Sequence, residues 1–183
     1  MTRWFEDLQA GDKFPLGSYT FSLEEIVEYN KQYDNQYFHV DPELAKHSHF
    51  GGIIASGWHT ACVGQRKLVD GLIAEEKLLR SIGQEPGVSG PSPGINKMRF
   101  ITPVKPGDTV SFELCVTDKR LSKSLPGWGL LFNNMTAINQ HNEIVYKAEF
   151  VGFSKLRDFK PNLKQRIGMW IAGIPVLRKI LQR

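Results

Sequence analysis

The sequence predicts an α+β fold, in which a curved antiparallel sheet wraps around one long central helix. Two patterns indicate it: an apolar helical stretch follows Ser56 and runs to about Ile73, and alternating extended stretches dominate after residue 109. One long helix and several antiparallel strands bury their apolar faces by packing as two layers. The 183 residues suit a single domain, which we expect at 1–154, followed by a basic, partly apolar C-terminal tail at 155–183.

Two short helices are expected before the long one. Ser22 and Glu25 have the spacing of a capping box, which opens a helix that should end near Asp34. Asp41 before Pro42 is typical of an N-cap with proline in the first turn, and indicates a short helix through residue 45. Residues 34–40 between these helices are expected to be irregular, and polar side chains on such a segment are well placed for chemistry.

The long helix should begin with Ser56 as its N-cap. Its first turns are apolar, so Cys62 is interpreted as a buried thiol and His59 as a core histidine with its hydrogen bonds satisfied. Residues 74–94 mix charged residues with glycine and proline, which indicates a connection or a lid.

Strands follow. Residues 109–116 alternate cleanly, with apolar side chains on one face: Val110, Phe112, Leu114 and Val116. Residues 130–138 and 144–153 are two further extended runs, and the polar residues 139–143 between them indicate a hairpin connection.

The composition excludes several classes of protein. A hydrophobic share of 41% and a charged share of 23% are ordinary for a globular chain, and not for a collagen-like, disordered or membrane-spanning one. Cys62 and Cys115 are far apart and outside any C-x-x-C pattern, so no disulfide framework or zinc ribbon is expected. The first residues include no apolar signal segment. These features predict a cytoplasmic enzyme or binding domain.

Positive charge is concentrated in the tail. Residues 155–183 hold eight basic residues and one acidic residue, whereas residues 1–154 carry a small negative net charge. Because no zinc-finger or RNP-type motif is present, we expect no nucleic-acid partner. Residues 167–177 form an apolar run with basic flanks, too short to span a bilayer. This run would either contact a membrane surface weakly or pack on the sheet or on a dimer partner.

Asp34 and His39 are the strongest candidates for catalysis. A carboxylate and an imidazole held around one small volume can polarise a water molecule and transfer a proton, as hydration of a double bond requires. Histidine also titrates close to neutral pH. The spacing alone equally fits a plainer interpretation, with Asp34 as a helix-end cap and His39 as a half-buried loop residue.

Ser56 and Gly57 at the start of the long helix add a second feature. Free backbone N–H groups and the positive end of the helix dipole stabilise a developing oxyanion, and glycine permits close approach of a carbonyl group. An ordinary capped core helix is the alternative. An acid, a base and an oxyanion site together suit chemistry at the α and β carbons of a thioester.

Residues 33–45 resemble a known signature. They contain the pattern D-x-[NQ]-x-x-H-x-D-P-x-x-A, from Asp34 to Ala45, of the MaoC-like family of (R)-specific enoyl-CoA hydratases (hydratase 2). Residues 50–60 are similar to the start of that family's long helix, and residues 92–95 and 100–109 are similar to its later sheet segments. The resemblance covers roughly residues 3–153.

The resemblance implies a hot-dog fold, a homodimer, and a CoA or acyl-carrier thioester as substrate, without a cofactor. Asp34 and His39 match the catalytic pair, and Gly57 matches the donor to the thioester carbonyl. Further substrate contacts are expected from Gln36, which also orders its loop, from Ser56, and from Lys97 and Arg99, as candidate partners of CoA phosphates. His47 and His49, with His39 and Asp41, fit no metal-ligand spacing, and no metal is expected.

The predicted function is reversible hydration of a 2-enoyl thioester to an (R)-3-hydroxyacyl thioester, within fatty acid metabolism. Two alternatives stay open: a hot-dog acyl-CoA thioesterase, and a non-catalytic acyl-thioester binding protein. The length and branching of the acyl chain, the choice between CoA and a carrier protein, and the physiological direction are also open.

Overall fold

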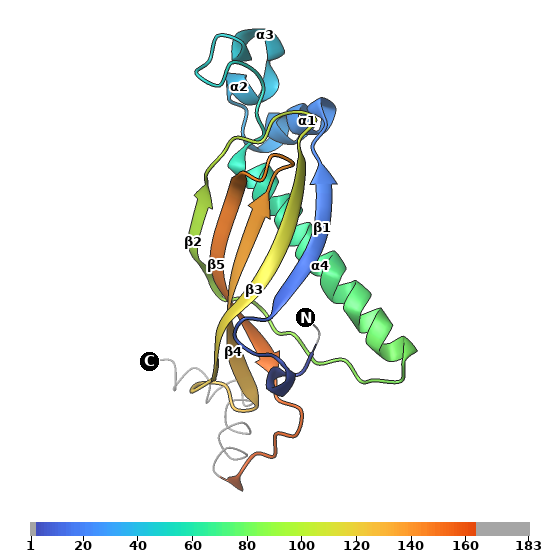
Figure 1. The fold of residues 1–183 in the computed structure, drawn as a ribbon. Helices are drawn as coiled ribbons and strands as arrows, with labels where there is room; N and C mark the ends of the chain where they lie inside the picture. Colours follow the sequence, from blue (N-terminus) through green and yellow to red (C-terminus); the bar gives the residue numbers. More distant parts are fainter. Residues whose placement is uncertain (1–2, 164–183) are drawn as a thin grey trace.

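A computed structural model describes residues 3–163, and Figure 1 shows its arrangement of one sheet and one long helix. A 3₁₀ turn (Phe5–Asp7) precedes β1 (Lys13–Thr20). Three helices follow: α1 (Leu23–Tyr33), α2 (Tyr37–Val40) and α3 (Pro42–Ala45). The long helix α4 (Gly57–Ser81) then leads to four strands, β2 (Gly94–Phe100), β3 (Thr109–Leu121), β4 (Trp128–Ile138) and β5 (Ile144–Lys155).

The five strands form one antiparallel sheet in the order β1-β3-β4-β5-β2, and the sheet curves along α4 (Figure 1). The three predicted strands and the hairpin at 139–143 are confirmed. The residue pattern did not predict β1 and β2. A bulge interrupts each strand, between Pro15 and Gly17 in β1 and between Ile95 and Lys97 in β2, so apolar alternation covers only a few residues in either.

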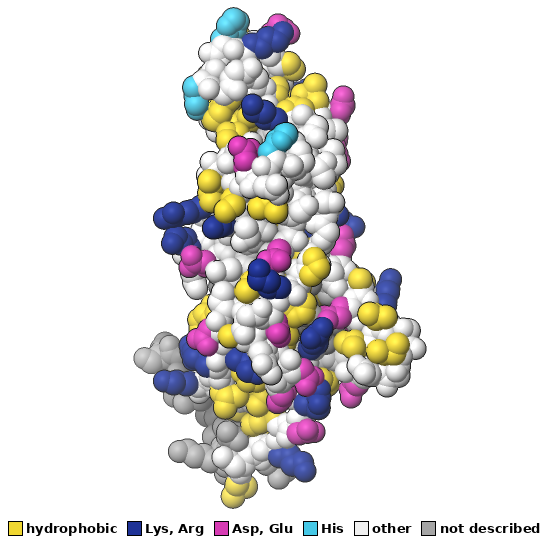
Figure 2. Space-filling view, viewed as in Figure 1, with side chains coloured by type: hydrophobic (Ala, Val, Ile, Leu, Met, Phe, Trp, Pro, Cys, Tyr) yellow, Lys and Arg dark blue, Asp and Glu magenta, His cyan; other side chains and the backbone are white. Residues whose placement is uncertain are grey.

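Helix α4 is longer than predicted. It continues past residue 73 to Ser81, because residues 74–81 consist mainly of strong helix formers and Arg80 pairs with Glu76 one turn earlier. The assignment of 74–94 as a connection was therefore wrong for its first part, and the connection covers 82–93. Figure 2 shows hydrophobic side chains at this protruding end, where Leu78 and Ile82 are exposed.

The predicted caps are confirmed. Ser22 and Glu25 form the capping box of α1, and Asp41 accepts hydrogen bonds from two backbone N–H groups at the start of α3. The segment between α1 and α3 differs from the prediction, because residues 37–40 form one helical turn instead of irregular chain. The turn begins where the His39 backbone N–H donates to the carbonyl of Gln36.

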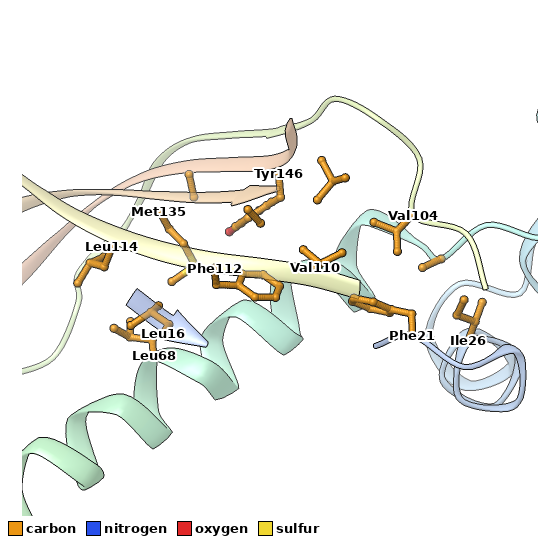
Figure 3. Close-up of a cluster of buried hydrophobic side chains, with 14 of the residues drawn as sticks. Leu16, Phe21, Ile26, Leu68, Val104, Val110, Phe112, Leu114, Met135 and Tyr146 are labelled. Atoms are coloured by element: carbon orange, nitrogen blue, oxygen red, sulfur yellow. The ribbon is translucent and has the colours of Figure 1, made fainter. Parts of the chain in front are cut away.

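Side chains from both layers meet in one core. Figure 3 shows Phe112, Leu114 and Met135 of the sheet facing α4. Gly64 allows this close approach, because a Cβ atom there would lie 3.0 Å from the sulfur of Met135. Cys62 of α4 is exposed, so its predicted burial was wrong. His59 is buried, but its Nδ1 has no hydrogen-bond partner within residues 3–163, so it is not the satisfied histidine that was predicted.

The C-terminal tail begins after β5. Arg157 pairs with the carboxylate of Asp7, and its backbone N–H donates to Glu6. Residues 164–183, which include the apolar run predicted to contact a membrane or a partner, lie outside the described residues. None of the helices within residues 3–163 is long and apolar enough to cross a membrane.

Candidate active site

Asp34 is held by side chains from two separate segments. As the C-cap of α1 it donates its backbone N–H to the carbonyl of Asn30 at 2.9 Å. Its Oδ2 accepts a hydrogen bond of 2.7 Å from the hydroxyl of Ser56, and its Oδ1 accepts one of 2.8 Å from the amide of Gln36. The carboxylate is thereby fixed between the end of α1 and the start of α4.

His39 lies on α2 and is 5% exposed. Its Nδ1 is 2.7 Å from the carbonyl oxygen of Ile54, and since a carbonyl only accepts, Nδ1 carries the hydrogen in that bond. The other nitrogen, Nε2, lies 3.5 Å from Oδ2 of Asp34. In a neutral imidazole with this tautomer, Nε2 presents a free lone pair beside the carboxylate, and can accept a proton.

The environment of Asp34 favours its charged form. Burial would raise the pKa of the carboxyl group, but the hydrogen bonds from Gln36 and Ser56, with His39 nearby, lower the pKa below its ordinary value. Asp34 is therefore a carboxylate at neutral pH, and acts as a hydrogen-bond acceptor.

The start of α4 lies against this pair. The hydroxyl of Ser56 accepts a hydrogen bond of 3.2 Å from the backbone N–H of Trp58 while it donates to Asp34. Gly57 follows as the first helical residue, and its backbone N–H makes no hydrogen bond within the described part of the chain. A Cβ atom on Gly57 would lie 2.3 Å from the ring of Phe100, so only glycine fits here without a shift of that ring.

A cavity of about 380 Å³ extends from this end of α4 between the helix and the sheet. Its near end is lined by Trp58, Cys62 and Tyr146, and Figure 3 shows Tyr146 directed from the sheet towards α4. The rest is lined mostly by apolar side chains: Leu8, Phe14, Leu68, Leu72, Met98, Leu114, Val116, Leu131, Met135, Ala148, Phe150 and Phe153. Asp34, His39, Ser56 and Gly57 do not line this cavity themselves, but Trp58, which follows Gly57, does, so an apolar space large enough for a ligand begins next to the start of α4.

The remaining predicted site residues lie elsewhere. Lys97 is on β2 and pairs with Glu149 at 3.5 Å, and Arg99 is exposed two residues further along the same strand. Met98 and Phe100 contact Tyr146 on the cavity side, so Lys97 and Arg99 point to the outer face of the sheet, away from Asp34. Within residues 3–163, no group of three or more histidine, cysteine or acidic side chains is arranged to hold a metal ion.

Three aromatic residues around the site were not predicted. Tyr29 of α1 stacks on His59, with ring centroids 4.3 Å apart, and its hydroxyl is 3.4 Å from the sulfur of Cys62. Phe100 covers Gly57 and stacks on Tyr146, with ring centroids 5.9 Å apart. These residues come from separate elements, and only the alternation of β5 gave a signal, for Tyr146.

The chain is similar to several known proteins. A family model described as "MaoC like domain" matches residues 9–126. The chain is 28% identical over 144 residues to the uncharacterized protein YdeM of Bacillus subtilis, covering 79% of this chain and 93% of that protein. The structure of a MaoC-like dehydratase from Rhodospirillum rubrum superposes with a TM-score of 0.68 at 27% identity, covering 85% of this chain and 99% of that one.

A further solved structure is the (R)-hydratase from A. caviae involved in PHA biosynthesis, with a TM-score of 0.51 and 22% identity, covering 83% of this chain and 99% of that one. At this identity, the likeness concerns the fold alone. The antiparallel sheet curved around a long helix is the hot-dog fold, which confirms the predicted fold class.

Proposed function

Because the chain belongs to the MaoC-like domain family, we propose that it catalyses reversible hydration of a 2-enoyl thioester, carried on CoA or on an acyl-carrier protein, to a 3-hydroxyacyl thioester. One observation carries the proposal. Nε2 of His39 and Oδ2 of Asp34 lie 3.5 Å apart near the start of α4, where the N–H of Gly57 makes no hydrogen bond within residues 3–163. The resemblance to the (R)-specific hydratases supports the (R) configuration of the product.

Each group has a role in the addition of water. The Asp34 carboxylate accepts a hydrogen bond from the water and orients it. Nε2 of His39 takes a proton from that water as its oxygen bonds to C3 of the substrate. Negative charge then moves to the thioester oxygen, where the N–H of Gly57 and the start of α4 stabilise it. The imidazolium beside Asp34 finally gives its proton to C2, which completes the addition of one water molecule.

Gln36 and Ser56 act on Asp34 in this proposal. Both donate hydrogen bonds to its carboxylate, so they fix its orientation and keep it charged. In this proposal both act as positioning residues for Asp34.

The chain is further proposed to form a homodimer through β2. This edge strand is exposed, with Ile95 at 54% and Phe100 at 47%, and the neighbouring Trp58 and Ile101 are exposed too. An exposed apolar edge strand is a template for pairing with another strand. Light scattering of the purified chain should give a dimer mass and Ile95→Lys should lower it, whereas a monomer mass for the unmodified chain would contradict pairing.

Hydration is tested by mixing the purified chain with crotonyl-CoA and longer enoyl-CoAs and following the absorbance of the enoyl thioester. We expect the absorbance to fall with the unmodified chain and to stay constant with Asp34→Asn. Release of free thiol from these substrates would indicate a thioesterase instead, because hydrolysis also removes the enoyl-thioester absorbance whereas hydration releases no thiol. If enoyl-CoAs bind but none of them is converted, the chain would be a binding protein instead.

A further inference from the structure

The cavity is longer than a four-carbon acyl group needs. Along β5 its lining runs from Tyr146 to Phe153, which is about 23 Å at the usual rise of a strand. Along α4 it runs from Trp58 to Leu72, which is about 20 Å at the rise of a helix. The volume of about 380 Å³ holds on the order of ten water-sized groups at about 30 Å³ each.

A buried amide faces this apolar space. Asn133 lies on β4 between Leu131 and Met135 on the same face of the strand, lines the cavity, and is only 6% exposed. Its Nδ2 donates to the carbonyl of Leu131 at 3.0 Å, but its Oδ1 accepts no hydrogen bond from the described residues. This Oδ1 is not among the fully buried atoms that lack a partner, so it is an acceptor open to the cavity, and a ligand group that donates to it would be favoured over an apolar group.

Gly152 keeps the space beside this amide open. It lies on β5 opposite Leu131, and a Cβ atom there would meet only Nδ2 of Asn133, at 3.9 Å. Any larger side chain at residue 152 would extend into the space near Asn133. The glycine and the amide together form a polar pocket partway along an apolar cavity.

The polar group recognised there must be uncharged. No charged side chain lines the cavity within the part of the chain that the structure describes. Of the other polar lining residues, Gln65, Ser89 and Ser92 are exposed and so lie at its rim, and Cys62 and Tyr146 lie at its near end. Burial of an unpaired carboxylate beside Asn133 would be strongly unfavourable.

We propose that the cavity binds an acyl chain longer than four carbons that carries a hydroxyl group within reach of Asn133, which makes Asn133 and Gly152 specificity-determining residues. The proposal rests on the proposed function in one respect: the thioester at the start of α4 anchors the chain. The hydroxyl donates to Oδ1 of Asn133, and the remaining carbons contact the apolar lining.

Binding to the Asp34→Asn variant separates this proposal from catalysis. Calorimetric titrations compare decanoyl-CoA with isomers of hydroxydecanoyl-CoA, whose single hydroxyl group is moved along the distal half of the chain. We expect at least one isomer to bind about tenfold more tightly than decanoyl-CoA, the value of one hydrogen bond. Equal or weaker binding of every isomer would overturn the proposal, whatever crotonyl-CoA hydration shows.

Two further substitutions, made in the same Asp34→Asn background, identify the residue. Asn133→Leu should abolish the preference for the hydroxyl isomer, whereas the matched control Asn134→Leu, at an exposed residue next in the strand, should retain it. Loss of the preference in both variants, or in neither, would contradict a role for Asn133. Circular dichroism checks that each variant is folded.

Gly152→Val, in that same background, gives a second test if Asn133→Leu does not fold. The valine side chain should weaken binding of decanoyl-CoA and of the preferred isomer severalfold, and leave the Kd of butyryl-CoA unchanged, because the short chain ends before residue 152. An equal effect on all three ligands would overturn the placement of the chain. Decanoyl-CoA with a terminal carboxylate should bind more weakly than decanoyl-CoA itself, and tighter binding would contradict an uncharged pocket.

Discussion

Asp34 lies at the end of α1 and Asp41 at the start of α3, within one short stretch, yet the structure uses them differently. Asp41 accepts hydrogen bonds of 2.9 Å and 3.0 Å from the backbone N–H groups of Glu43 and Leu44, all within its own turn. Asp34 accepts from side chains, and one of them, Ser56, is 22 residues away. Asp41, whose hydrogen bonds lie within one turn, stabilises the start of its helix. Asp34 accepts a hydrogen bond from the cap of a different helix, so its position depends on how the helices pack.

The largest expected effect separates these two aspartates. Asp34→Asn should lower kcat/KM for enoyl-CoA hydration by about 10²–10⁴-fold, since general acid–base assistance is lost. Asp41→Asn should leave kcat/KM close to the original value, because asparagine also caps helices well. Initial rates of both variants with one substrate decide the point. A similar loss in the two variants would show that Asp34 is no more than a structural cap.

Two serine caps sharpen the same comparison. Ser22 and Ser56 each accept a hydrogen bond from the backbone of the helix that they begin, so alanine at either should cost about 1 kcal/mol of stability. Only Ser56 also donates to Asp34. Ser56→Ala should therefore lower kcat about tenfold in addition, the value of one hydrogen bond, while Ser22→Ala should not. Denaturation midpoints and kcat are measured on both, and equal kcat values would refute the link to Asp34.

The pH dependence of activity gives a smaller effect. Hydrogen bonds from Gln36 and Ser56 help to keep the pKa of Asp34 below its ordinary value. The fall in kcat/KM that protonation of Asp34 causes, here called the acid limb, should therefore lie in strongly acidic solution, separate from any fall caused by loss of the free base His39. Gln36→Ala removes one of these bonds, which raises the pKa of Asp34 and moves the acid limb to higher pH. A pH–rate profile of the two proteins measures the shift, and Glu43→Ala beside Asp41 serves as the control without a shift. Superimposable acid limbs for the Gln36 variant would contradict this role.

Signals confined to a few residues allowed prediction, and signals spread over the chain did not. The caps at Ser22, Asp41 and Ser56 were predicted because each is a contact within one turn. The edge strand β2 was not predicted from its pattern, because a bulge between Ile95 and Lys97 limits its apolar alternation to the last few residues. Asp34 and His39 are five residues apart and were predicted together, but the hydrogen bond from Ser56 to Asp34 and the nearby cavity depend on the packing of α1, α4 and the sheet.

The smallest expected effect concerns the free energy of unfolding, and it comes from a comparison of the two buried histidines, His39 and His59. Nδ1 of His39 is bonded to a carbonyl, whereas Nδ1 of His59 has no partner within residues 3–163, and burial lowers the pKa of His59 below 6.5. The stability that neutral His59 contributes is fully present above about pH 6.5, its unfolded value, and is lost as the pH falls towards its folded pKa.

His59→Phe keeps an aromatic ring between Tyr29 and Phe21 but removes the titrating group. The free energy of unfolding of the original chain should therefore decrease between pH 7.5 and pH 5.5 by up to about 1.4 kcal/mol per pH unit more than that of the variant. Urea unfolding at the two pH values measures this difference. Because His59 is separate from the proposed chemistry, hydration at neutral pH should be unchanged. Parallel stability curves would mean that water or a small movement satisfies His59, and that burial alone does not distinguish it from His39.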